Sequence, residues 1–107
     1  MEYIRKGSYA TFEFELTDGD GNPIDLSYVT VKFIVKKNRS DDDGAAVLSD
    51  EIENSPTHRI MFQFDATEIE NINDGDYYVA LKMFKENDLN DEIWNDKLRI
   101  EKETFNE

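Results

Sequence analysis

The sequence of 107 residues contains no cysteine, one histidine, two prolines and a single tryptophan. The lack of cysteine excludes disulfides, thiolate nucleophiles and cysteine-ligated zinc or iron–sulfur sites. No apolar run approaches the roughly 20 residues of a membrane-spanning helix, and none at the start resembles the core of a signal peptide. We therefore expect a protein made in the cytoplasm, with no membrane segment.

Positively charged residues are also scarce. The sequence has 12 Lys and Arg residues but 25 Asp and Glu residues, which gives a net charge of −13. Such a surface repels phosphate backbones and anionic membranes, so we expect neither nucleic acid nor membrane among the partners. An acidic surface keeps a domain soluble and complements a basic partner protein.

Hydrophobic residues are plentiful by comparison, at 38% of the chain, and they recur at the two-residue period of β-strands. In residues 10–16, for example, apolar Ala10, Phe12, Phe14 and Leu16 alternate with threonine and glutamate. One face of such a strand packs on a core and the other meets water.

Seven segments show this pattern or a weaker form of it. They are residues 1–6, 9–17, 29–37, 45–53, 59–65, 77–84 and 94–101. Turn-forming residues separate them, and no amphipathic helix long enough for a parallel crossover lies between them. The sequence therefore predicts one all-β domain over residues 1–107, an antiparallel β-sandwich of about seven strands with an immunoglobulin-like layout.

Three local features refine this prediction. Residues 65–72 suit a short helix capped by Asp65 or Thr67. Either Tyr77 or Tyr78 then occupies the place of the tyrosine corner of immunoglobulin-like sandwiches. Near the C-terminus Asp96 interrupts the apolar alternation, so we expect a β-bulge there.

The stretch TDGDGNPIDL invites comparison with a calcium loop, because Asp18, Asp20 and Asn22 alternate in it. A helix–loop–helix calcium loop needs glycine at its sixth position and glutamate at its twelfth. Counting from Asp18, these positions hold Pro23 and Val29. We therefore expect a turn between two strands, with positive φ at both glycines of DGDG, and weak calcium binding by acidic loops stays open.

The remaining chemistry-bearing residues do not form a catalytic set. The acidic run of residues 40–44, SDDDG, is typical of a solvated loop tip, since adjacent side chains point in different directions. His58 has no nucleophile motif around it and is interpreted as a surface histidine. We expect no enzyme, no cofactor and no metal site.

Four residues are candidates for contact with a partner. Ile34, Met61 and Phe84 are apolar on the nominally outward face of their strands, and Trp94 offers an aromatic platform. Two interpretations stay open for the outward residues, namely a surface for another subunit or contact with covering loops.

Residues 7–37, GSYATFEFELTDGDGNPIDLSYVTVKFIVKK, resemble the immunoglobulin-like N-terminal domain of baseplate upper proteins from phages of Gram-positive bacteria. The family pattern is an alternating strand, D-x-x-G-x-P-I-D-L, and then V-x-F-x-V-K. The matching residues are Asp18, Gly21, Pro23, Ile24, Asp25, Leu26, Val31, Phe33, Val35 and Lys36. Further on, Gly75 and Tyr77 match the family's G-x-Y strand, and DKLRIEK resembles its closing strand.

The resemblance implies a non-enzymatic structural module of the virion, built into the tail, baseplate or neck. It implies other virion proteins as partners, a homo-oligomer in the particle, and no catalytic residues. The turn motif also resembles bacterial adhesion and surface repeats, so a carbohydrate- or cell-surface-binding sandwich is the alternative, and an enzyme ranks last.

Overall fold

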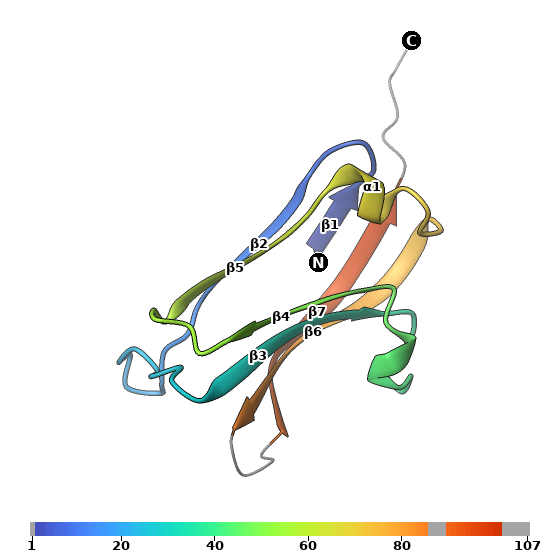
Figure 1. Cartoon of the computed structure of the whole chain (residues 1–107). Coiled ribbons are helices and arrows are strands. Elements are labelled where there is room, and N and C mark those ends of the chain that lie inside the picture. The colour runs from blue at the N-terminus through green and yellow to red at the C-terminus, as the bar shows by residue number, and fades with distance from the viewer. Residues whose placement is uncertain (1, 86–89, 102–107) are drawn as a thin grey trace.

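The computed structural model describes residues 2–85 and 90–101, which form seven strands and two short helices (Figure 1). The elements are β1 (Glu2–Arg5), β2 (Ala10–Glu15), β3 (Val29–Lys36), the 3-10 helix η1 (Asp43–Ala45), β4 (Leu48–Glu53), β5 (Arg59–Phe64), α1 (Ala66–Ile69), β6 (Gly75–Lys85) and β7 (Asn90–Glu101). A curled five-stranded sheet, in the order β1-β7-β6-β3-β4, packs against a two-stranded sheet of β2 and β5. The expected all-β sandwich of seven strands is confirmed. Within the described ranges, no helix has the length and apolar character to cross a membrane.

The strand order has the layout of an immunoglobulin-like sandwich. Strands β3, β6 and β7 lie together as the C, F and G strands do, and β2 pairs with β5 as strand B pairs with E. All described pairs are antiparallel except β1–β7, which is parallel, so the expectation of a purely antiparallel fold is wrong at this one place. A parallel pair needs a long connection, and the whole domain lies between β1 and β7.

The core forms between the two sheets from the alternating apolar residues. Phe33 and Phe62 are fully buried, and their rings stack with centroids 5.4 Å apart. Phe12, Phe14 and Phe64 pack around Phe33 with ring centroids between 4.7 and 6.3 Å away. Aromatic rings at offset or tilted contact stabilise a core beyond the area that they bury.

The β-bulge lies at a different residue from the one expected. The β6–β7 register shifts between Leu81, which pairs with Trp94, and Lys82, which pairs with Glu92, so Ile93 is the extra residue. Asp96 instead pairs regularly with Val79. Asp96 lies on the core-facing side of β7, but β1 pairs with β7 only from Leu98 onward. Asp96 is therefore at an open edge of the sheet, where an acidic side chain is accommodated.

The connection between β5 and β6 follows the sequence prediction. Asp65 Oδ1 accepts a hydrogen bond from the backbone N–H of Glu68, and Glu68 Oε2 accepts one from the N–H of Asp65, which makes a capping box. The hydroxyl of Tyr77 donates to the carbonyl of Asn73 at 2.6 Å. Tyr77 rather than Tyr78 is therefore the tyrosine corner.

Candidate interaction surfaces

The acidic turn after β2 uses its carboxylate on the backbone. Asp18 Oδ1 accepts hydrogen bonds from the N–H groups of Asp20 and Asn22, and Thr17 forms a bridge with Pro23. Gly21 has a positive φ of 84°, whereas Gly19 does not, so the expectation of positive φ at both glycines is wrong for Gly19. The predicted turn is otherwise confirmed, and the described residues contain no group of three potential metal ligands.

The acidic run SDDDG folds back onto the outer face of the five-stranded sheet. Asp43 accepts from Lys82 Nζ at 2.9 and 3.0 Å and from Lys36 Nζ at 3.2 Å. Lys36 is almost fully buried and also donates to the carbonyls of Arg39 and Asp41. Ser40, Asp42 and Gly44 are exposed, but Asp43 is partly buried and paired, so the expectation of a solvated run is wrong for Asp43.

The charge of Asp43 is stabilised by this geometry. Partial burial acts to raise the pKa of Asp43, but hydrogen bonds and attraction from Lys82 and Lys36 outweigh it and hold the pKa below its usual value. Since Lys36 pairs with Tyr78 and Lys82 pairs with Lys32, the Lys36–Asp43–Lys82 bridge runs diagonally over the intervening Ile34–Ala80 pair. The aliphatic pair is therefore closed off from solvent.

A second cluster, formed by Tyr78, Glu92 and Arg39, lies beside Lys36 on the same face of the sheet. The hydroxyl of Tyr78 donates to Glu92 Oε1 at 2.6 Å, and the guanidinium of Arg39 lies 5.6 Å from the ring of Tyr78. Arg39 Nη2 lies 3.5 Å from Glu92 Oε2. Burial, followed by the hydrogen bond and the charge of Glu92, raises the pKa of Tyr78 to about 12.

The four candidate partner residues do not form one surface in the structure. Ile34 is fully buried, and loop residues 39–43 supply its cover. Phe84 is half-buried on the same sheet face, opposite Thr30. Trp94 faces the core side, with its ring 5.0 Å from that of Phe14. Met61 is half exposed, at 50%, on the outer face of the two-stranded sheet.

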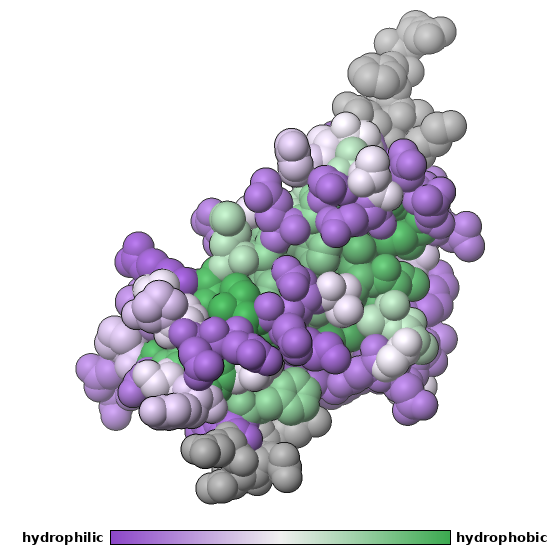
Figure 2. Space-filling model, in the orientation of Figure 1, coloured by the Kyte–Doolittle hydropathy of each residue, from purple (hydrophilic) through white to green (hydrophobic). Residues whose placement is uncertain are grey.

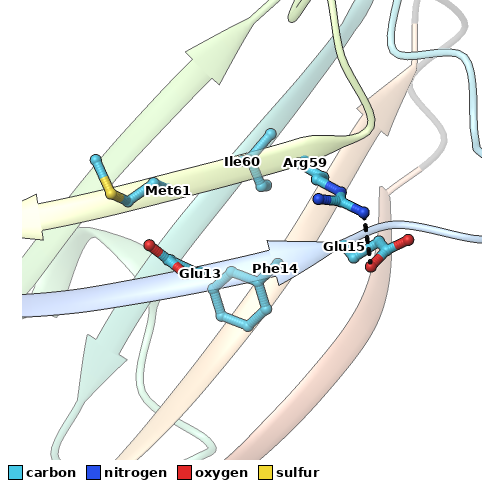
Figure 3. Close-up of a pocket in the computed structure, with 6 residues that line it drawn as sticks. All are labelled: Glu13, Phe14, Glu15, Arg59, Ile60 and Met61. Atoms are coloured by element: carbon cyan, nitrogen blue, oxygen red, sulfur yellow. Dashed lines mark ion pairs between the residues drawn. The ribbon is translucent and has the colours of Figure 1, made fainter.

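Met61 borders a shallow hollow of about 440 Å³ on the two-stranded sheet (Figure 3). Its other lining residues are Glu13, Phe14, Glu15, Arg59 and Ile60. The Arg59 guanidinium lies 3.8 Å from Glu15, and His58 Nε2 lies 3.3 Å from the other oxygen of that carboxylate. The hollow therefore has Met61 beside its cross-strand partner Glu13 at one end, and the cluster of Glu15, Arg59 and His58 at the other (Figure 3).

A second hollow of about 390 Å³ lies between the loop after β2 and the loop before β5. Beside these loops, Tyr28 is 76% exposed and has a positive φ of 59°, a rare conformation for an aromatic residue. Its N–H donates to Asn54 Oδ1 at 2.7 Å, and Asn54 has a positive φ of 51°. This hydrogen bond stabilises the unusual backbone conformation of Tyr28, whose side chain is exposed to solvent.

Comparisons with protein-family models, with curated proteins and with solved structures return no match to this chain.

Sequence reasoning missed two features of these surfaces. The role of Asp43 depends on two lysines that are 7 and 39 residues away, and nothing in the local sequence marks the pairing. The open edges of β2 and β5 follow from the sheet order. The one available signal was the lack of charge of either sign inside residues 60–64, IMFQF.

Proposed function

We propose that this chain is a non-enzymatic structural protein of a bacteriophage particle, acting through protein–protein contacts in the tail, baseplate or neck. Its partners are other virion proteins and further copies of itself, and it joins the virion after synthesis in the host cytoplasm. The observation that carries the proposal is the two-stranded layer, in which β2 and β5 have no strand partner but each other among the described residues and so leave edges for other chains.

The positions of the family-like residues support the proposal. Gly21 and Pro23 shape the turn after β2, and Phe33 lies at the centre of the core. Gly75 has a positive φ of 150° at the start of β6, two residues before the corner Tyr77. Residues with such backbone and packing roles are the ones that determine a fold, so the resemblance falls on positions that build the sandwich.

The ionisable groups support a structural role. His58 contacts Glu15, and no described hydroxyl forms a hydrogen bond with its ring. The pKa values of Asp43 and Tyr78 are perturbed, but both residues lie in the network that covers Ile34. Ion-pair networks that close a structure perturb pKa values as active sites do.

The test is a phage in which an early stop codon interrupts this gene, grown in hosts with or without a plasmid-borne copy. We expect particles from the non-complemented host to lack part of the tail, baseplate or neck in electron micrographs and to lose infectivity. We also expect mass spectrometry to detect the chain in purified wild-type virions. Complete and infectious particles without the chain would refute the proposal, and plasmid complementation controls for polar effects on neighbouring genes.

A carbohydrate- or cell-surface-binding module is the second candidate, and exposed Tyr28 beside the loop hollow is the observation that favours it. An aromatic ring held outward stacks well on a sugar ring. A glycan array probed with the wild-type chain and with Tyr28→Ala tests it, with calcium present and absent. Binding that the substitution abolishes would favour this function, and no binding in either condition would argue against it.

A further inference from the structure

The described part of the sandwich has several open strand edges. Strands β1 and β4 end the five-stranded sheet, and within residues 2–85 and 90–101 the strands β2 and β5 pair with no strand but each other. Strand β7 is also open over residues 90–97, since β1 pairs only with Leu98–Glu101. An open edge presents unpaired backbone groups to other chains, and proteins protect such edges with charges and with inward-facing acidic residues.

The two sides of the five-stranded sheet are protected by the same arrangement. On β4, Asp50 Oδ1 accepts a hydrogen bond from the N–H of Glu51 at 2.8 Å. On the open part of β7, Asp96 Oδ1 accepts one from the N–H of Lys97 at 2.7 Å. Both aspartates occupy core-facing positions, opposite Phe33 and Val79 respectively. Each carboxylate therefore accepts the hydrogen bond of a backbone N–H that an added strand would need for pairing.

Strand β5 has no inward-facing acidic residue of this kind. Its sequence, RIMFQF, contains no Asp, Glu, Pro or Gly, whereas β1, β2, β4 and β7 all contain acidic residues. Short segments of high β-propensity and low charge without proline are those most prone to pair with another strand. Figure 2 looks onto the side of the sandwich between β5 and β4, where apolar surface lies between polar rims.

The hydrogen-bond pattern fixes which backbone groups of β5 face the open edge. Leu16 donates its N–H to the carbonyl of His58, so these two residues form a hydrogen-bonded pair of the β2–β5 ladder. Pairs alternate along an antiparallel ladder, so the N–H and C=O groups of Arg59, Met61 and Gln63 point outward. The N–H of Arg59 is bonded to Thr57 Oγ1, which leaves Met61 and Gln63 as the outward donors.

We propose that β5 pairs antiparallel with β5 of a second copy, about a two-fold axis at Met61. In this register Met61 faces Met61, Arg59 faces Gln63, and the two small sheets join into one of four strands, β2-β5-β5-β2. The inference rests on the proposed function and deepens it, because it names the self-contact of an assembly module. An isologous pair of this kind closes on itself and forms a dimer rather than a fibre.

A second copy fits this edge better than a basic partner does. A chain with a net charge of −13 approaches its own copy most easily where carboxylates are absent, and β5 is that place. The glutamates of β2 lie three strand spacings from those of the other copy, about 14 Å, which exceeds a Debye length of about 8 Å at physiological salt. A basic partner would instead find its complement along β4, which contains Asp50, Glu51 and Glu53.

Sedimentation velocity over a range from micromolar to about 0.5 mM protein tests the proposal. The decisive variant is Met61→Pro, because proline is tolerated on an edge strand where the N–H faces solvent but cannot pair there. We expect the wild type to dimerise reversibly and Met61→Pro to dimerise at least about tenfold more weakly. Glu51→Pro is the matched control, since its N–H also faces an open edge, that of β4, and we expect it to associate like the wild type.

Circular dichroism establishes whether each variant folds. If Met61→Pro does not fold, Met61→Lys replaces it, since the two lysines would face each other across the two-fold axis and repel. Hydrogen exchange of the Met61 and Gln63 amides supplies a direct readout, with protection expected to rise with protein concentration. A wild type that stays monomeric, or a folded Met61→Pro that dimerises normally, would overturn the inference. A monomeric chain that phage particles nonetheless require overturns the inference and leaves the proposed function standing, whereas a dimer that particles do not require refutes only the function.

Discussion

We expect Asp43→Ala, at the start of η1, to destabilise the fold. It removes the shared partner of Lys36 and Lys82, whose side chains are 4% and 16% exposed. Lys36 keeps its hydrogen bonds to the carbonyls of Arg39 and Asp41, but no described carboxylate other than Asp43 forms an ion pair with it. The variant therefore leaves an almost fully buried ammonium without its counter-ion.

The magnitude follows from the burial of the three groups. Removing one partner of a fully buried ion pair costs about 3–5 kcal/mol, whereas an exposed pair contributes at most about 1 kcal/mol. The Asp43 side chain is 28% exposed, between these limits, so we expect a loss of about 2.5 kcal/mol in the free energy of unfolding. For a domain of this size that loss lowers Tm by roughly 10 °C.

Urea denaturation of wild type, Asp43→Ala and Asp42→Ala at neutral pH measures the effect. Asp42 is the matched control, because it lies next to Asp43 in the same loop but its side chain makes no capping hydrogen bond, and we expect a change within about 0.5 kcal/mol. The pKa of Asp43 is lowered in the folded state, so its contribution is present above 3.8 and is lost as the pH falls through the lowered value. Equal stabilities for the two variants at neutral pH would refute this account of the network.

Two further predictions concern the adjacent tyrosines. Tyr77→Phe removes the hydrogen bond to the Asn73 carbonyl and should cost about 1–2 kcal/mol in urea denaturation, and a loss within error would show that the corner is not stabilising. In alkaline spectrophotometric titration, Tyr78→Phe should remove an ionisation step near pH 12. A step near pH 12 that persists in the variant would contradict the assignment. Because the pKa of Tyr78 is raised from 10.0 in the folded state, the stability that the protonated Tyr78 contributes is complete below pH 10 and is lost as the pH rises through 12.

Much of the fold could be predicted because its determinants are local. Alternation in residues 10–16 and 29–35 identified core-facing side chains, and Asp65, one of the two caps expected, is the residue that caps α1. The parallel β1–β7 pair escaped prediction because nothing in a strand's own sequence encodes the direction of its neighbour. The bulge was expected at Asp96, since an acidic residue on a core parity suggests a break, yet an edge position accommodates it without one.

The candidate surface was harder to predict, because exposure depends on contacts between distant segments. Ile34 has an outward parity, but the loop that follows β3 closes over it through Asp43. Met61 has the same kind of parity on β5 and is half exposed, whereas η1 contacts β3. Parity distinguishes the two faces of a strand, and only the tertiary structure shows which outward residues are covered.

The closed network also narrows where another chain can bind. A partner that used Ile34 would have to displace Asp43 from both lysines, and the estimate of about 2.5 kcal/mol for losing Asp43 corresponds to roughly a seventyfold loss of affinity. Pairing with β5 requires no comparable disruption, because the N–H groups of Met61 and Gln63 already point outward and the strand contains no proline. Of these two surfaces, the edge of β5 is therefore the one at which a second chain has less existing structure to disrupt.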